Sequence, residues 1–304
     1  MHVYFTHLDL PARDGLCGSP TTHSPTHTTH NTRTRTAQAL AFHDSEFRLA
    51  SASDDMTIKV WDLQAPGKRG KGNASPTITY RGHVAPVLSL ALSSSSGLIF
   101  SGDSAGNIRT WKLPAADATP KPFDPALTVA SLAAHKDAVW GLDCTSDGSK
   151  VLSAGADEVA NVYTVGGGEL VVIATAKGPA PIGCAEFARS DATKFVIGCK
   201  SGHGAIHDVL SGELVRTLGA DEGQGSAVNC IKTHATLSFV ATANEDKTIN
   251  FYDMSSGDLL HSMTAHQAAV GSIAFDPSGL YMVSGGHDRS VRMWDVGTRT
   301  CVYE

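Results

Sequence analysis

One interval recurs along this sequence and constrains its fold more than any other feature. A histidine and an aromatic residue lie 28 positions apart in three places, His83 and Trp111, His135 and Tyr163, and His266 and Trp294. An aspartate stands six positions before an aromatic residue in four places, at Asp55, Asp157, Asp246 and Asp288. Three matches at one spacing indicate an internal repeat, in which every unit is one supersecondary structure.

Each unit has the pattern of short antiparallel strands. Residues 40–63, LAFHDSEFRLASASDDMTIKVWDL, contain three alternating apolar runs separated by turn residues. A fourth run follows the aromatic position, as in ELVRTL (213–218) and DLLHSM (258–263). Four strands in a unit of about 40 to 45 residues predict an all-β fold, the β-propeller, with one four-stranded blade for each repeat.

Composition excludes several classes of protein. Lys and Arg number 24 against 30 Asp and Glu, and the net charge of −6 argues against a nucleic-acid binder. No apolar run approaches the roughly 18 to 20 residues that span a bilayer. The six cysteines are scattered without CxxC or zinc-ligand spacing. The N-terminus lacks a secretory signal pattern. We therefore expect a cytoplasmic protein without a cofactor or metal.

The repeat resembles the WD repeat, and longer stretches resemble the C-terminal propeller of the striatin family. These stretches are residues 41–63, 80–94, 134–144 and 245–304. The resemblance covers roughly residues 37–304, without the family's N-terminal coiled coil and last repeat. The resemblance implies that this chain is an interaction scaffold in a signalling assembly. Its partners there would be the scaffold subunit of protein phosphatase 2A, Mob-like adaptors and kinases. Because phosphatase contact in the family depends on the coiled coil, the resemblance implies weak or no phosphatase binding by this chain.

The repeats divide the chain into two parts. Residues 1–36, rich in threonine and histidine, are expected to be disordered, since such polar sequence cannot bury a core. Residues 37–304 form the predicted propeller. Its six recognisable repeats predict a seven-bladed ring that lacks one blade, and the fourth repeat has lost most of the shared polar residues. The repeats lie near 37–63, 80–113, 132–165, 180–210, 226–254 and 264–304.

The recurring polar residues are interpreted as hydrogen-bonded networks that stabilise the blades. A buried aspartate is costly unless it is paired, and a histidine, a strand serine and a Trp or Tyr complete the pairing. A catalytic triad is the alternative, but a triad occurs once, whereas this set recurs from blade to blade. Ala105 replaces the aspartate in the second repeat, and Arg33 replaces the histidine in the first. The predicted network residues are Ser51, Asp55, Trp61, His83, Ser101, Trp111, His135, Ser153, Asp157, Tyr163, Asp246, Tyr252, His266, Ser284, Asp288 and Trp294.

Two positions in each repeat are candidates for binding. One is at the entry of the innermost strand, where Gln38, Leu88, Trp140, Gly183, Asn229 and Gly271 stand. The other directly precedes the turn aspartate, where Asp54, Ser104, Ala156, Glu245 and His287 stand. The predicted protein-binding residues are Trp140, Leu88, Asn229, Glu245, His287 and Asp54. Trp140 is either a binding anchor or a residue packed into the channel wall.

Three functions are compatible with a propeller. A non-catalytic interaction scaffold needs only the rigid ring and its loops, and this function is favoured. A propeller enzyme needs a single, unrepeated cluster of acids, bases or ligands, and the sequence shows none. A ubiquitin-ligase substrate receptor, or another generic WD-repeat adaptor, is the alternative. The ligase-docking pattern W-D-x-R is absent, because Gln64 and Gly297 end the relevant tetrapeptides.

Overall fold

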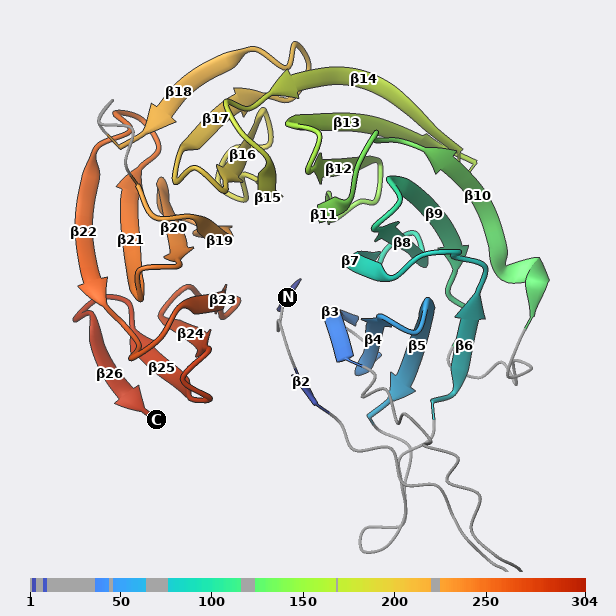
Figure 1. The fold of residues 1–304 in the computed structure, drawn as a ribbon, viewed down its shortest axis with the longest axis horizontal. Coiled ribbons are helices and arrows are strands. Elements are labelled where there is room, and N and C mark those ends of the chain that lie inside the picture. Colours follow the sequence, from blue (N-terminus) through green and yellow to red (C-terminus); the bar gives the residue numbers. More distant parts are fainter. Residues whose placement is uncertain are drawn as a thin grey trace, which may run out of the picture.

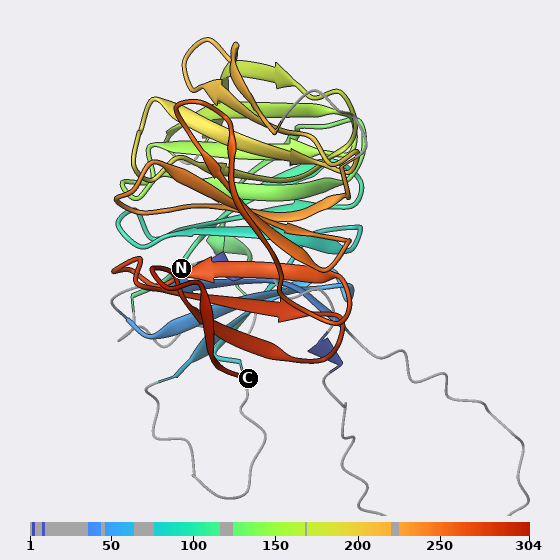
Figure 2. The same ribbon diagram turned by 90° about the vertical axis from the view of Figure 1, so that its left-hand side faces the viewer.

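The chain folds into a propeller of six blades around a central channel. A computed structural model describes residues 2–3, 8–9, 36–43, 46–63, 76–115, 124–167, 169–219 and 225–304. Within these residues the chain forms six antiparallel sheets and a single short 3-10 helix, Pro125–Leu127 (Figure 1). Seen from the side, the strands run between the two faces of the ring (Figure 2).

Every blade contains four strands that follow one another in the chain. The innermost strands are β3 (Thr36–His43), β7 (Val87–Ser93), β11 (Val139–Cys144), β15 (Ile182–Phe187), β19 (Val228–Thr233) and β23 (Val270–Phe275). The second strands are β4 (Arg48–Ser53), β8 (Leu98–Asp103), β12 (Lys150–Gly155), β16 (Lys194–Cys199), β20 (Phe239–Asn244) and β24 (Tyr281–Gly286).

The third strands carry the aromatic position, and the fourth form the rim of the ring. The third strands are β5 (Thr57–Asp62), β9 (Asn107–Lys112), β13 (Val159–Gly166), β17 (Gly204–Asp208), β21 (Thr248–Asp253) and β25 (Val291–Asp295). The fourth strands are β6 (Ile78–Arg81), β10 (Thr128–Ala133), β14 (Glu169–Lys177), β18 (Leu214–Leu218), β22 (Leu259–Thr264) and β26 (Thr300–Tyr303). The fourth repeat therefore forms a complete blade despite its lost polar residues.

The core lies between the blades. In blades 2 to 5 the second strand buries every residue after its first, because neighbouring blades cover both faces. In blades 1 and 6, by contrast, the second strand is less buried. Only alternate residues of β4 are buried, and in β24 only Met282 and Ser284 are buried. Each terminal blade therefore leaves one face less covered than the faces inside the array. This burial pattern is that of a ring interrupted between its first and last blades.

The first blade also includes two very short strands from the N-terminal segment. His2–Val3 (β1) and Leu8–Asp9 (β2) pair with β3, and β1 also contacts β23 of the last blade. They lie between the blue first blade and the red sixth blade (Figure 1). The rest of residues 1–35, including Arg33 and the histidine-rich tract, lies outside the described residues. The prediction of an all-β fold with six four-stranded blades is confirmed.

The polar networks of blades 3 and 6 have the same geometry. In blade 6, His266 Nε2 lies 2.7 Å from Ser284 Oγ, and Trp294 Nε1 donates to the same oxygen over 2.8 Å. Because the Asp288 carboxylate can only accept, Nδ1–H of His266 donates to it over 3.0 Å, and Nε2 therefore accepts the proton of the Ser284 hydroxyl. In blade 3 the equivalent contacts are His135 Nε2 to Ser153 Oγ at 2.6 Å, His135 Nδ1 to Asp157 at 2.9 Å, and Ser153 Oγ to Tyr163 Oη at 3.4 Å.

Blade 2 corrects the expectation that its network lacks an aspartate. Asp103, two residues before Ala105, accepts from His83 Nδ1 over 2.8 Å, while His83 Nε2 and Trp111 Nε1 meet at Ser101. The equivalent position in the blade 3 network is Gly155, where a Cβ atom would collide with both His135 and Asp157. The carboxylate of the network can therefore come from the position of Asp103 or from the position of Asp157. Whichever of the two positions does not supply it holds a small residue, Ala105 in blade 2 and Gly155 in blade 3.

Among the residues that the structure describes, blades 1, 4 and 5 show parts of the network only. Trp61 Nε1 donates to Ser51 Oγ over 2.9 Å in blade 1, where Asp55 accepts from the backbone N–H of Thr57 over 3.0 Å. In blade 5, Asp246 accepts from Thr248 over 3.1 Å, whereas Tyr252 Oη accepts from Asn250 over 3.3 Å. In blade 4, His207 stands at the aromatic position, stacked on Phe195 and bound through Nδ1 to the Gly212 carbonyl.

Two buried histidines should make stability depend on pH. Burial lowers the pKa of both His83 and His207 below the ordinary value of about 6.5. The unfolded chain therefore binds protons that the folded chain does not. As pH falls below about 6.5, we expect each histidine to remove up to about 1.4 kcal/mol of unfolding free energy per pH unit. Urea unfolding at pH 7.5, 6.5 and 5.5 measures this slope.

The matched variant is His207→Tyr, which places the residue of blades 3 and 5 at this position. Its slope should be smaller by the contribution of one histidine. Hydrogen bonds hold the pKa of Asp103 low against the raising effect of burial, so its titration affects stability only below about pH 4. Equal slopes for the variant and the parent chain between pH 7.5 and 5.5 would contradict the assignment to His207.

Candidate protein-binding site at the channel mouth

A β-bulge that recurs in the innermost strand of every blade positions the residues of this site. In every blade the pairing of the innermost strand with the second strand shifts near the start of the innermost strand, around its third residue in blade 1 and around its second residue in the other five blades, which is the mark of a β-bulge. A bulge bends the strand and changes the direction of the extra side chain. The bulged residues are Gln38, Leu88, Trp140, Gly183, Asn229 and Gly271, the strand-entry positions predicted from the sequence.

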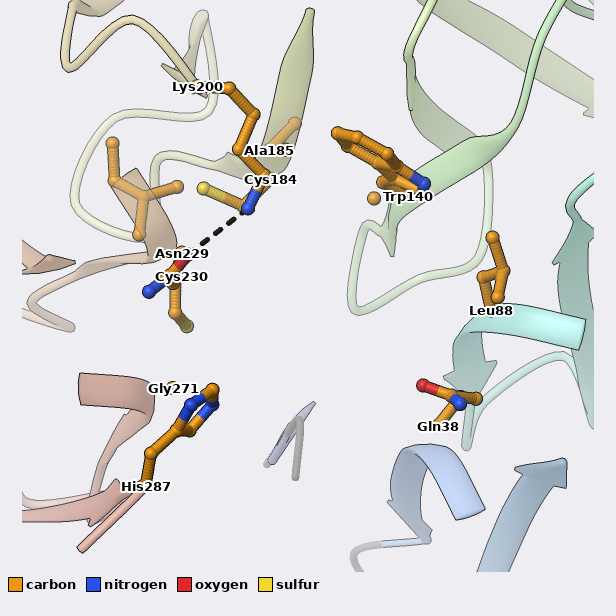
Figure 3. A pocket seen from close by; sticks show the side chains of 13 residues that line it. Gln38, Leu88, Trp140, Cys184, Ala185, Lys200, Asn229, Cys230, Gly271 and His287 are labelled. Carbon is orange, nitrogen blue, oxygen red and sulfur yellow. Dashed lines mark hydrogen bonds between the residues drawn. The ribbon is translucent and has the colours of Figure 1, made fainter. Parts of the chain in front are cut away.

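All six bulged residues line one cavity of about 360 Å³ at the mouth of the channel. Leu88, Gln38 and Trp140 stand on one side of it, and Lys200, Asn229 and His287 stand on the other (Figure 3). Residues that follow the bulges, including Cys184 and Cys230, complete the lining. The structure thus brings residues from all six blades to a single concave surface.

A chain of polar contacts crosses one side of the cavity. Lys200 Nζ lies 5.4 Å from the ring centroid of Trp140, in cation–π geometry, and donates to Asn229 Oδ1 over 3.1 Å. Figure 3 shows the second contact as a dashed line. Asn229 Nδ2 in turn donates to Glu245 over 2.9 Å and to the Val270 carbonyl over 3.1 Å. These contacts fix the Asn229 amide and hold the lysine beside the indole.

The residues predicted from the turn position fall into two groups. His287 lines the cavity, whereas Asp54 and Glu245 lie behind it and accept hydrogen bonds from Gln38, over 2.8 Å, and from Asn229. A carboxylate therefore sets the orientation of each amide, and Gln38 keeps its carbonyl oxygen for the cavity, whereas both amide groups of Asn229 are already engaged. Ser104 and Ala156 are not among the lining residues.

Lys200 was missed by the sequence-based analysis although it occupies the equivalent turn position. It stands seven residues before His207, as His287 stands seven residues before Trp294. The fourth repeat lacks both the turn aspartate and the Trp or Tyr that mark this position elsewhere. The fixed spacing was the only signal that could have found it.

The thiols and the candidate metal ligands at the mouth show which chemistry its described residues offer. Burial raises the pKa of the Cys184 and Cys230 thiols above their ordinary value, so neither is an activated nucleophile. Within the described part of the chain, no three His, Cys, Asp or Glu side chains are placed to share a metal ion. What remains is an apolar wall with an indole ring, one lysine, one histidine and two oriented amides.

Comparison with known proteins places this architecture in a family. The model of the family "WD domain, G-beta repeat" matches residues 23–62, 74–112, 127–164, 212–253 and 257–295, which together are more than half of the chain. The chain belongs to the WD-repeat family. The five matches leave 165–211 between them, a stretch that covers most of the fourth blade of this WD-repeat propeller.

The WD-repeat propeller is similar to striatins over most of its length. It is 36% identical to striatin-3 of Bos taurus and 35% identical to striatin-3 of Homo sapiens over 278 residues. It is 36% identical to striatin of Mus musculus over 286 residues. Each comparison covers 88% of this chain, but the chain spans only about a third of the length of these relatives.

A solved structure supports the fold alone. A chain from a crystal structure of the mitotic checkpoint complex superposes with a TM-score of 0.72 at 18% sequence identity. The superposition covers 86% of this chain and 75% of the other. Among the described residues of the WD-repeat propeller, no helix has the length and apolar character needed to cross a bilayer.

Proposed function

We propose that this propeller is a non-catalytic, cytoplasmic scaffold that binds a partner protein at the channel mouth. The observation that supports the proposal most directly is the convergence of bulged residues from all six blades on one cavity. An indole beside a lysine suits a protein interface, because Trp combines a large apolar area with little conformational freedom. The propeller contributes a rigid frame that keeps these side chains in place before binding.

The similarity to striatins extends the proposal to a class of partner. We propose that the mouth docks regulators of a protein phosphatase 2A and kinase assembly, with Mob-like adaptors as the direct partner. Striatins are the relatives that share 88% of this chain at about 35% identity, which supports a striatin-like role for the shared propeller. Direct contact with the phosphatase scaffold subunit is not part of the proposal.

Trp140→Ala tests whether the indole at the channel mouth binds the partner. Co-purification with the tagged full chain should recover Mob-like adaptors, and the variant should capture them about tenfold less, since loss of a buried interface anchor costs at least about 1.4 kcal/mol. Quantitative mass spectrometry of the bound fraction measures the ratio. Thermal unfolding of the variant should stay close to that of the parent chain, because Trp140 is only half-buried.

The control is Tyr303→Ala, which removes an exposed aromatic residue from the outermost strand β26, far from the mouth. This variant should capture as much adaptor as the parent chain. Recovery of an unrelated complex without Mob-like adaptors would refute the partner class. Equal capture by the parent chain and Trp140→Ala would refute the mouth as the binding site.

A further inference from the structure

A second concave surface lies between blades 5 and 6, on the face opposite the channel mouth. It is a groove of about 440 Å³, built mainly from the loops 234–238 and 276–280 and the loop 296–299. The first two loops follow the ends of the innermost strands β19 and β23, whose second residues line the mouth. Since a strand runs from one face of the ring to the other, the groove and the mouth are separate sites.

Three leucines surround this groove and are exposed to solvent. Leu237, Leu260 and Leu280 have exposed fractions of 56%, 51% and 65%. They come from two loops and from the outer strand β22, so they form one patch from residues distant in sequence. A contiguous exposed apolar patch in a concave site is a mark of protein interaction.

The equivalent groove between blades 2 and 3 shows that the fold does not require these leucines. That groove has Ser96 and Ser149 at the positions of Leu237 and Leu280, counted from the starts of the second strands. Both grooves keep a glycine with positive φ beside the serine or leucine, Gly148 at 70° and Gly279 at 75°. The backbone is therefore shared, and the leucines are an addition at blades 5 and 6.

The floor of the groove is formed by packed aromatic rings. His234 packs against Phe239 with ring centroids 4.7 Å apart, and Phe239 lies 5.8 Å from Phe251. His234 Nδ1 accepts from the backbone N–H of Leu237 over 2.9 Å, so the proton resides on Nε2, which donates to the Gly279 carbonyl over 3.1 Å. The histidine thus joins the two loops that carry Leu237 and Leu280.

Arg299 places a positive charge at the edge of the groove. Its side chain is exposed, lines the groove, and has no hydrogen-bond or ion-pair partner among the residues that the structure describes. The acids of the neighbouring turns are already engaged, Asp276 by the Tyr281 N–H and Asp295 by the Thr298 N–H. An apolar groove with an unpaired guanidinium is complementary to an apolar side chain followed by a carboxylate.

We propose that this groove binds a segment of a second protein that presents a bulky apolar side chain next to an aspartate or glutamate. The apolar side chain enters between Leu237, Leu260 and Leu280, over the aromatic floor. The carboxylate pairs with Arg299. The site is independent of the channel mouth, and one can fail without the other.

A phage-displayed library of random dodecapeptides, selected on the full chain, tests the proposal. The selected peptides should share Leu, Phe or Met beside Asp or Glu. The double variant Leu237→Ser and Leu280→Ser, which copies the groove between blades 2 and 3, should weaken their binding about tenfold or more. Fluorescence anisotropy with a labelled selected peptide measures the change, and circular dichroism verifies that the variant is folded.

Arg299→Glu gives the sharper readout, because it should change the selected peptides from acidic to basic while the apolar residue remains. Trp140→Ala should bind the acidic peptides as the parent chain does. Four results would overturn the proposal: no enriched peptide, enrichment unaffected by the serine variant, a charge preference unaffected by Arg299→Glu, or dependence on Trp140. Sedimentation velocity showing a dimer that the serine variant abolishes would assign the groove to a second copy of the chain and would overturn it as well.

Discussion

Lys232→Met is expected to lower the free energy of unfolding by about 3 kcal/mol or more, the largest effect that we predict for a single substitution. Lys232 is 5% exposed, and its Nζ lies 2.9 Å from Oε1 of Glu186, which is fully buried on the neighbouring blade. Burial alone would lower the pKa of Lys232, but the Glu186 carboxylate raises it above the ordinary value, so the amine stays charged. Without the Lys232 amine, the buried Glu186 carboxylate keeps, among the described residues, only the half-exposed Arg189 as an ion-pair partner.

Glu186 is held between two blades, so its side chain cannot move to solvent when the Lys232 ammonium group is removed. Its Oε2 accepts from the Thr233 backbone N–H over 2.6 Å, and Asp143 makes the same contact to Phe187 one blade earlier, over 2.9 Å. In blades 3 and 4 the fifth residue of the innermost strand thus joins its blade to the next one. A carboxylate without its cation would have to become protonated or pull water into the wall of the ring.

The control is the double variant Glu186→Gln with Lys232→Met. Glutamine is neutral and its carbonyl oxygen can still accept from Thr233, so no isolated charge remains. We expect the double variant to recover at least half of the loss seen in the single variant. Urea unfolding of the three proteins at pH 7 provides the comparison. A double variant that is less stable than the single one would contradict the assigned role of the ion pair.

The sequence allowed the fold and part of the site to be predicted, because both depend on spacing within a repeat. The interval between His266 and Trp294 identifies a blade, and the second residue of an innermost strand can be counted from it. Trp140 and Asn229 were found in this way. Their binding role remains a prediction, while their meeting in one cavity is a feature of the structure.

What could not be predicted depends on contacts between repeats or on compensating changes within one. Asp103 was overlooked because its carboxylate enters the network from a position that is glycine in blades 3 and 6. Glu186 and Lys232 are 46 residues apart, and nothing in either repeat indicates that they meet. Leu237 and Leu280 are ordinary loop residues until the ring places them beside one groove.

Removing one hydroxyl from the network of blade 2 is expected to have the second large effect. Ser101 Oγ is fully buried, lies 2.6 Å from His83 Nε2, and accepts from Trp111 Nε1 over 2.8 Å. Ser101→Ala leaves both of these buried nitrogens without a partner. Because each unsatisfied buried group costs about 1 to 3 kcal/mol, we expect the two nitrogens together to lower the free energy of unfolding by at least about 2 kcal/mol.

Blade 5 offers a matched control at the same position. Thr242 stands on the second strand where Ser101 stands in blade 2, is 2% exposed, and its Oγ1 has no hydrogen-bond partner among the described residues. Thr242→Val removes this unpaired hydroxyl at nearly constant volume and should leave stability unchanged or raise it by up to about 1 kcal/mol. Thermal and urea unfolding of both variants measure the contrast. If the two substitutions had equal effects, the network would contribute no more than its packing, and the recurring His, Ser, Asp and Trp residues would need another explanation.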